Sequence, residues 1–273
     1  MRVAAIQMAS GPNVAANLSE AEKLIGLAAD DGAKLVVLPE NFAMMGMNER
    51  DKLGIAEQPG EGPIQRFLSR QAAARRVCIV GGTIPMVSKQ ADHIRAACLL
   101  YDDRGVLLSR YDKIHLFDVS IEQSGEKYNE SEIIEPGDDM VVSETVAGNL
   151  GLAVCYDLRF PELFRTLLES NMEVMAIPSA FTAITGSAHW DILVRARAIE
   201  NQCYVIAAAQ GGYHLNGRET YGHSMIVDPW GHVLDSLPRG SGVVSADIDL
   251  TYLNRIRKTF PAVKHRRLSC RTN

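Results

Sequence analysis

Short apolar runs alternate along this chain with segments of helical periodicity, and this alternation most constrains the fold. Runs of this kind, bounded by Gly, Pro or Asp, predict about ten β-strands. They are RVAAIQM, KLVVLP, VCIVGGT, ACLLYD, GLAVC, VMAIPS, CYVIAAA, SMIVDPWG, HVLDSL and VVSADIDL. Strands that alternate with amphipathic helices build layers in which helices cover the faces of a sheet. The sequence therefore predicts an α/β fold.

Three segments have the apolar spacing of helices that pack on a sheet. Residues 18–32 carry Leu, Ala and Ile on one face and end at a glycine suited to the position after a helix. Residues 161–170 begin with a proline, which suits a first helical turn, and residues 188–201 form the third segment. Residues 120–139 have no periodicity and predict a long loop. Loops of that length usually have a function.

Length and composition favour a single domain over residues 1–273. Hydrophobic residues make up 47% of the chain and charged residues 22%, without an internal repeat or linker-like segment. The formal net charge of −5 argues against nucleic acid as a partner. No apolar run approaches the roughly 20 residues of a membrane span. The five cysteines lack a C-x-x-C pair, which favours free thiols, so we expect a cytoplasmic protein without a membrane partner.

Cys155 is the first candidate for catalysis. It ends the apolar strand GLAV and precedes YDLRFPELF, the predicted start of a helix. A strand-to-helix turn presents a side chain at the carboxyl end of a sheet, where the helix dipole favours a thiolate nucleophile. The alternative is a buried core thiol, which is the commoner fate of such a cysteine.

Three charged residues are further candidates. Glu40 closes the apolar run KLVVLPE, and a carboxylate there needs a partner or a raised pKa, the latter suiting a general base. Lys113, within RYDKIHLFD, either reaches water or is held against a carboxylate. Glu130 lies among other charges in the predicted long loop. Taken singly, Glu40 and Glu130 are better explained as solvent-exposed charges.

Other chemistries lack their sequence patterns. The seven histidines show no H-x-x-x-H or H-E-x-x-H spacing and do not pair with cysteines at metal-ligand intervals, so we expect no metal. G-x-G-x-x-G, G-x-x-x-x-G-K-[ST] and G-x-S-x-G are also missing from the sequence. The sequence thus predicts no bound cofactor.

In combination, LPEN, YDKIHLFD and GLAVCYDLRFPELFR resemble the Glu-Lys-Cys set of the nitrilase superfamily of carbon-nitrogen hydrolases. The likeness extends over nearly the whole chain, through AIQM, AHW, RARAIENQCYVIAAAQ and YGHSMIVDPWG. The resemblance implies a four-layer α-β-β-α sandwich that forms a homodimer or higher oligomer through its helices. It also implies cleavage of a primary amide to an acid and ammonia through a cysteine thioester.

The resemblance assigns roles to the candidate residues. Cys155 would be the nucleophile and Glu40 the general base. Lys113 and the backbone N–H of Tyr156 would stabilise the oxyanion, and Glu130 would hold Lys113 and help to position the substrate. A catalytically silent scaffold that keeps the fold is the alternative, and the presence of Glu40, Lys113 and Cys155 argues against it.

The substrate is expected to be a small anionic amide. The chain looks most like the Nit branch, whose members act on deaminated glutathione or, as omega-amidases, on 2-oxoglutaramate and 2-oxosuccinamate; AAAQGG resembles the former group. Arg159 is our candidate for a substrate carboxylate, unless it pairs with Asp157 or Glu162. The remaining pocket wall is expected from the segment SAFTAITGSAHW, in which Ser187 replaces the family's habitual Pro. Its candidate residues are Phe181, Thr185 and His189.

Overall fold

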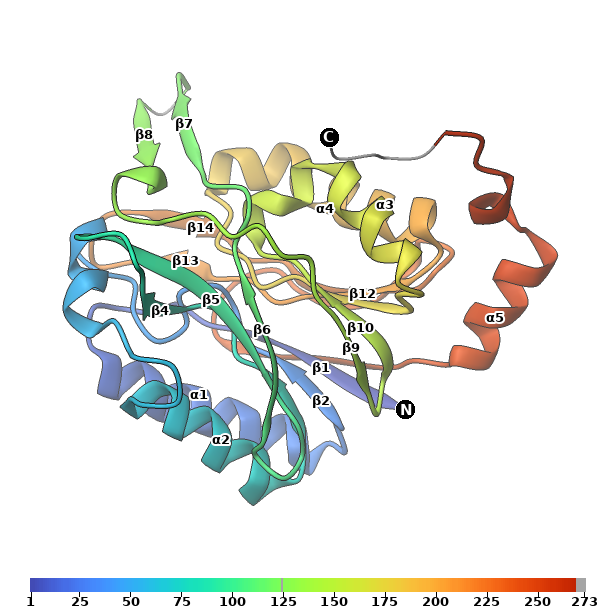
Figure 1. Ribbon diagram of the computed structural model, residues 1–273, viewed down its shortest axis with the longest axis horizontal. Coiled ribbons are helices and arrows are strands. Elements are labelled where there is room, and N and C mark those ends of the chain that lie inside the picture. The colour runs from blue at the N-terminus through green and yellow to red at the C-terminus, as the bar shows by residue number, and fades with distance from the viewer. Residues whose placement is uncertain (124, 269–273) are drawn as a thin grey trace.

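Two β-sheets pack face to face between two layers of helices in the computed structural model, which describes residues 1–123 and 125–268 (Figure 1). The first sheet runs in the order β17 (Gly242–Asp247), β1 (Arg2–Gln7), β2 (Leu35–Val37), β3 (Cys78–Val80), β5 (Ile94–Tyr101) and β4 (Ile84–Val87), with β6 (Leu107–Asp112) also paired to β5. The second runs in the order β16 (Val233–Leu237), β15 (Ser224–Val227), β12 (Tyr204–Ala207), β11 (Val174–Ala176), β10 (Gly148–Leu152) and β9 (Val142–Thr145).

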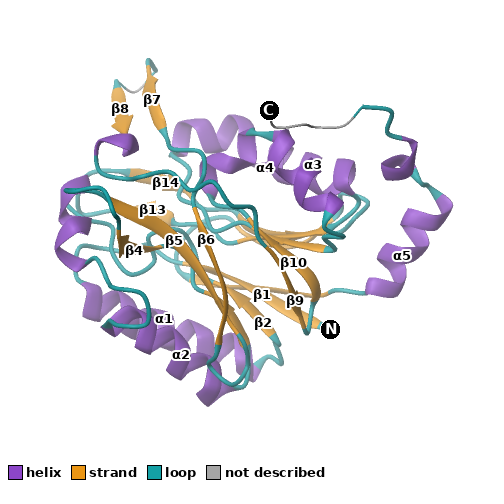
Figure 2. Ribbon diagram, viewed as in Figure 1, coloured by secondary structure: helices purple, strands orange, loops and turns teal. Residues whose placement is uncertain are grey.

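Helices cover the outer faces of both sheets (Figure 2). Helices α1 (Val14–Asp30) and α2 (Pro63–Arg75) pack on the first sheet, and α3 (Pro161–Glu169) and α4 (Ala183–Asn201) pack on the second. Helix α5 (Leu250–Thr259) follows β17 at the side of the sandwich. The predicted α-β-β-α sandwich is confirmed.

The alternation of side chains along β1 shows how the layers are held together. Val3 and Ala5 belong to the core between the two sheets, whereas Ala4 and Ile6 belong to the core beneath α1 and α2. Successive side chains of a strand point to opposite faces, so a strand buried on both faces is apolar throughout. The continuous apolar runs in the sequence therefore mark the central strands.

Parallel pairing brings the ends of these strands to one edge, where two of the candidate residues lie. β1, β2 and β3 are parallel to one another, and so are β10, β11 and β12. Parallel strands end at the same edge of a sheet, and ligand sites form beyond their carboxyl ends. Glu40 follows β2, and Cys155 follows β10.

All ten predicted strands are present, but the described residues contain seven more. Two of these, β7 (Asp118–Ile121) and β8 (Glu126–Asn129), form a hairpin inside the predicted long loop, so that prediction is wrong in part (Figure 1). The others are β4, β6, β9 and a small hairpin of β13 (Gly211–Tyr213) and β14 (Glu219–Tyr221). Apart from the short apolar β4, which contains a proline, their sequences are mixed or glycine-rich, and they lie at sheet edges or outside the two sheets.

The helices also depart from the prediction. Helix α4 begins at Ala183 because the Thr182 hydroxyl accepts a hydrogen bond from the Thr185 N–H and caps its first turn. Helices α2 and α5 and four short 3₁₀ segments were not predicted; the latter are η1 (Glu49–Ile55), η2 (Glu130–Glu132), η3 (Cys155–Arg159) and η4 (Ala262–His265). None of the helices described is both long enough and apolar enough to cross a bilayer.

Candidate active site

Cys155 sits in a sharp turn between β10 and the helix layer. Its φ is +48°, a left-handed conformation that costs a non-glycine residue energy and commonly marks a functional site. Its N–H donates to the Pro178 carbonyl at 2.9 Å, and its Sγ accepts a hydrogen bond from the Ala180 N–H at 3.4 Å. The predicted helix start is a five-residue 3₁₀ turn, with α3 following only at Pro161. The helix-dipole argument for a thiolate therefore does not hold.

Asp157, which the sequence analysis did not select as catalytic, fixes this turn. Its carboxylate is fully buried and accepts hydrogen bonds from the Val154 N–H at 2.8 Å and the Tyr111 hydroxyl at 2.6 Å. It also accepts one from the His115 N–H at 3.0 Å and lies 2.7 Å from His115 Nδ1. Tyr111 and His115 flank Lys113 in sequence. Asp157 thus ties the segment that carries the lysine to the turn that carries the cysteine.

Lys113 is held between two carboxylates. Its Nζ donates to Glu40 Oε1 at 2.8 Å and to the two Glu130 oxygens at 2.7 and 3.0 Å. The side chain of Lys113 is 1% exposed, that of Glu40 4% and that of Glu130 14%. Such a cluster is stable only because each charge is paired. The sequence prediction that Lys113 meets a carboxylate is confirmed.

Further hydrogen bonds fix the two glutamates, Glu130 through its carboxylate and Glu40 through its backbone carbonyl. Glu130 opens η2 just after β8, and its Oε2 also accepts from the Phe117 N–H at 2.8 Å. The Glu40 carbonyl accepts from Gln210 Nε2 at 3.0 Å. Lys113, Phe117 and Gln210 therefore hold Glu40 and Glu130 in place.

Burial and the neighbouring charges shift the pKa values of Glu40 and Cys155 in opposite directions. Burial disfavours the ionised form of Glu40, but the Lys113 ammonium and hydrogen bonds from Lys113 and Cys155 hold the pKa of Glu40 below its usual 4.5. Burial raises the pKa of the Cys155 thiol well above 9.0, and the negative charge of Glu40 adds to this. Of the two alternatives for Glu40, a partner and a raised pKa, the structure has the partner, Lys113, and the raised pKa of Cys155 opposes the expected thiolate. These directions favour an ionised glutamate beside a neutral thiol at rest.

A narrow cavity of about 10 Å³, called the inner pocket below, opens at the thiol. It brings together Glu40, Glu130, Cys155, Tyr156, Arg159, Phe181 and Thr185 of the predicted residues, with Phe117, Ala180 and Arg218 in addition. Lys113 and His189 are not among its lining residues: Lys113 is held by Glu40 and Glu130, which do line it, and His189 Nδ1 lies 3.1 Å from Arg159 Nη1. Sequence reasoning missed Arg218, which lies between β13 and β14 and gave no periodic or motif signal.

Arg159 lies over aromatic rings at this pocket. Its Cζ is 5.1 Å from the centroid of the Phe181 ring and 5.9 Å from that of Tyr156. No ion pair between Arg159 and Asp157 or Glu162 is found in the described chain, since Asp157 is engaged by Val154, Tyr111 and His115. The guanidinium is therefore available to an anion.

The inner pocket adjoins a wider cavity of about 650 Å³, the outer groove. Its walls come from residues 46–50, the β7–β8 hairpin and the turn between β13 and β14. Phe117, Glu130 and Arg218 line both cavities. Together the two cavities form a path from the surface to Cys155.

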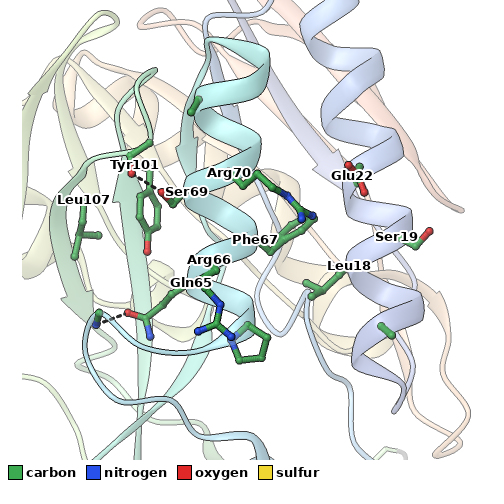
Figure 3. Close-up of a pocket in the computed structure, with 15 residues that line it drawn as sticks. Leu18, Ser19, Glu22, Gln65, Arg66, Phe67, Ser69, Arg70, Tyr101 and Leu107 are labelled. Atoms are coloured by element: carbon green, nitrogen blue, oxygen red, sulfur yellow. Dashed lines mark hydrogen bonds between the residues drawn. The ribbon is translucent and has the colours of Figure 1, made fainter.

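A different cavity of about 960 Å³ lies on the outer helix layer, between α1 and α2 (Figure 3). Leu18, Glu22, Arg66, Phe67 and Arg70 surround it, with Tyr101 and Leu107 at its far wall. It contains none of the predicted site residues. Its mixed lining indicates no particular ligand.

Comparison with known proteins decides the family. The model of the carbon-nitrogen hydrolase family matches residues 2–258. The chain belongs to the carbon-nitrogen hydrolase family. This confirms the resemblance seen in the three sequence motifs.

Individual relatives of this carbon-nitrogen hydrolase agree. The deaminated glutathione amidase of Yersinia enterocolitica is 43% identical over 266 residues, covering 97% of this chain and 92% of that protein. The structure of Saccharomyces cerevisiae Nit3, a member of branch 10 of the nitrilase superfamily, has a TM-score of 0.87 at 32% identity and covers 98% of this chain and 97% of that one. The C. elegans NitFhit structure has a TM-score of 0.91 at 35% identity, covering 100% of this chain and 67% of that one. The chain is therefore an amidase of this family, and the scaffold alternative is not supported.

Proposed function

We propose that this carbon-nitrogen hydrolase cleaves deaminated glutathione through a thioester on Cys155. One observation carries the proposal: Lys113 Nζ is held at 2.7–3.0 Å by Glu40 and Glu130, and both carboxylates line the same pocket as the Cys155 thiol and two arginines. This arrangement suits nucleophilic attack on an amide of an anionic compound. The name of the Yersinia relative supports the substrate.

The first step is attack by sulfur with simultaneous proton transfer. Because the resting thiol is neutral, Glu40 takes its proton as Sγ bonds to the amide carbon and the carbonyl electrons move to oxygen. Lys113 and the backbone N–H of Tyr156 stabilise the resulting oxyanion. Preorganised donors of this kind each contribute about 3 kcal/mol.

The second step expels the amine and then hydrolyses the thioester. Glu40 gives its proton to the amide nitrogen as the C–N bond breaks, which leaves an acyl group on Sγ. Glu40 then accepts a proton from a water molecule that attacks the thioester, and the thiol is released with the free acid. The reaction consumes one water and leaves the enzyme unchanged.

The chemistry of deaminated glutathione corrects the expected products. In this compound a 2-oxo acid is joined through its distal carbonyl to the nitrogen of cysteinylglycine, so the reacting amide is secondary. Its cleavage releases 2-oxoglutarate and the dipeptide. Ammonia is the product only if the substrate is a primary amide such as 2-oxoglutaramate.

The acyl half of the substrate is proposed to lie in the inner pocket. Arg159 binds its 2-oxo carboxylate, because a guanidinium pairs with a planar carboxylate through two N–H groups. Phe181 and Thr185 form the facing wall, and His189 positions Arg159 from behind. This places the reacting carbonyl between Cys155 and Lys113.

The deciding measurement compares two substrates that share one acyl group. Wild-type enzyme is incubated with deaminated glutathione or 2-oxoglutaramate, and 2-oxoglutarate is measured in both cases. We expect a kcat/KM at least tenfold higher for deaminated glutathione, since only it extends into the outer groove. Preference for 2-oxoglutaramate, with ammonia as the second product, would identify an omega-amidase instead.

We also propose a homodimer formed through the outer face of α4. Ile192 and Ile199, seven residues apart, are 66% and 49% exposed on this helix, and Trp230 and Phe260 pack edge to face nearby with ring centroids 5.7 Å apart. Clustered exposed apolar side chains indicate an association surface. Ile199→Glu is expected to convert a dimer to monomers in sedimentation velocity. Leu27→Glu, at a residue 52% exposed on α1 in the opposite layer, should leave the dimer intact, and loss of the dimer in both variants would contradict the assigned surface.

A further inference from the structure

Arg218 lies where the inner pocket opens into the outer groove. It is one of three residues that line both cavities, and the other two, Phe117 and Glu130, flank the path with it. A substrate whose reacting carbonyl lies at Cys155 must pass Arg218 to reach the surface. Arg159, by contrast, lines the inner pocket alone. Arg159 and Arg218 are therefore placed to contact different parts of a bound molecule.

The guanidinium of Arg218 has an unused hydrogen-bond donor. Its Nε–H is buried and has no acceptor among the residues that the structure describes. Its Nη2 donates to the Ala180 carbonyl at 3.0 Å, and its Cζ lies 4.8 Å from the centroid of the Tyr128 ring. None of the ion pairs found in the described chain includes it. A buried cationic donor without an acceptor is costly unless a ligand supplies one.

The backbone around Arg218 is fixed rather than free to turn away. The Arg218 N–H donates to Asn216 Oδ1 at 3.0 Å, and Asn216 Nδ2 donates to the Gly46 carbonyl at 2.8 Å. The turn between β13 and β14 is thus attached to the opposite wall of the outer groove. A side chain held this way is preorganised for a ligand.

We infer that Arg218 binds the terminal carboxylate of the departing peptide and so selects amides with anionic leaving groups. The inference rests on the proposed function, in which cysteinylglycine is the leaving group. That dipeptide spans up to about 7 Å when extended. The inner pocket is assigned to the acyl half, so the dipeptide extends toward the outer groove along a path that Arg218 lines. Its terminal carboxylate can then accept hydrogen bonds from Nε–H and from a terminal N–H group of Arg218.

The test is a cycle of two enzymes and two substrates. Wild type and Arg218→Gln are assayed on deaminated glutathione and on the same compound with its terminal carboxylate converted to an amide, by release of 2-oxoglutarate. For wild type, we expect kcat/KM to fall about 10- to 100-fold on loss of the substrate carboxylate, mainly through KM, as for a charge-assisted hydrogen bond. For Arg218→Gln, the two substrates should differ by less than about threefold. Arg239→Gln removes a 64% exposed cation that pairs with Glu219, and it should keep the wild-type ratio.

The outcomes separate this inference from the proposed function. Arg218 does not bind the terminal carboxylate of the leaving group if wild type hydrolyses both substrates equally well. The same follows if Arg218→Gln keeps the wild-type ratio of kcat/KM for the two substrates. If wild type hydrolyses neither, the proposed function fails as well. Should Arg218→Gln not fold, the wild-type comparison still decides, and Arg218→Lys, which keeps a donor to Ala180, should give an intermediate ratio.

Discussion

Cys155→Ser is expected to lower kcat on deaminated glutathione by at least about 10⁴-fold, because loss of the nucleophile removes the covalent route. Serine has nearly the same shape but a far less acidic and less nucleophilic oxygen, and the lowered pKa of Glu40 makes that carboxylate too weak a base to ionise it. The measurement is single-turnover release of 2-oxoglutarate, with mass spectrometry of the trapped acyl-enzyme. Wild type should show the acyl adduct on the tryptic peptide that contains Cys155.

Cys203→Ala provides the matched control. Cys203 is also a buried free thiol, but it contacts the Arg197 carbonyl in the core and lies outside both cavities. Its replacement should change kcat by less than about twofold, at a stability cost of about 1 kcal/mol for the small cavity. A Cys155→Ser enzyme with more than a hundredth of wild-type activity would contradict the thioester route.

The pH dependence of alkylation tests the neutral thiol at the same residue. A simple thiol with a raised pKa would react with iodoacetamide about ten times faster for each unit of pH up to that pKa. Cys155 hydrogen-bonds to an ionised Glu40, so general-base assistance should keep its reactivity nearly constant at neutral pH and lower it only below about pH 4.5 as Glu40 is protonated. Glu40→Gln should lose this plateau.

The sequence predicted which residues form the site better than it predicted their protonation. Glu40 and Cys155 each follow a strand that an apolar run marks, so their convergence at one edge was predictable, whereas Lys113 follows β6, which no apolar run marks. The protonation of the three residues was not predictable. It depends on Lys113 lying 2.8 Å from a carboxylate 73 residues earlier in the chain, and on the exclusion of water from all three groups. Neither fact has a local sequence signal.

The same reasoning explains which elements the sequence did not reveal. Strand β6 carries exposed Leu107 and Leu108 and a charged Arg110–Asp112 pair, so its sequence does not read as an apolar run. Strand β13 contains two glycines. The sequence suggested Asp157 only as a possible partner of Arg159, because two of the residues that it binds, Tyr111 and His115, are distant in sequence. Arg218 can be recognised as a site residue only from its position between the two cavities.

Lys113→Met should be the most damaging change for the fold and should also inactivate the enzyme. It leaves Glu40 and Glu130 buried and facing each other without their shared cation, and breaking a buried ion pair on one side costs about 3–5 kcal/mol. Lys23→Met, at a lysine 69% exposed and 4.0 Å from Glu20, should cost less than about 1 kcal/mol. Urea unfolding of both variants measures the difference. Equal losses in the two variants would show that the buried cluster contributes nothing to stability.

The pH dependence of stability should change sign in Lys113→Met. In wild type the folded-state pKa of Glu40 is lowered, so its contribution is present above the unfolded value of 4.5 and is lost as pH falls through the folded value. Without Lys113, burial dominates and raises the folded-state pKa of Glu40 above 4.5, so the protonated form is favoured in the folded protein. The variant should therefore gain stability as pH falls from neutral toward 4.5, where wild type gains none from Glu40.

A second substitution separates the charge from the catalytic function of Lys113. Adding Glu130→Gln to Lys113→Met removes one of the two unbalanced carboxylates and should restore a large part of the lost free energy of unfolding. It cannot restore activity, because no cation then faces the oxyanion, and kcat should stay at least about 10²–10³-fold below wild type. Recovery of activity together with stability would show that Lys113 serves only to balance charge. Recovery of stability without activity is the result expected if Lys113 also stabilises the oxyanion in the transition state.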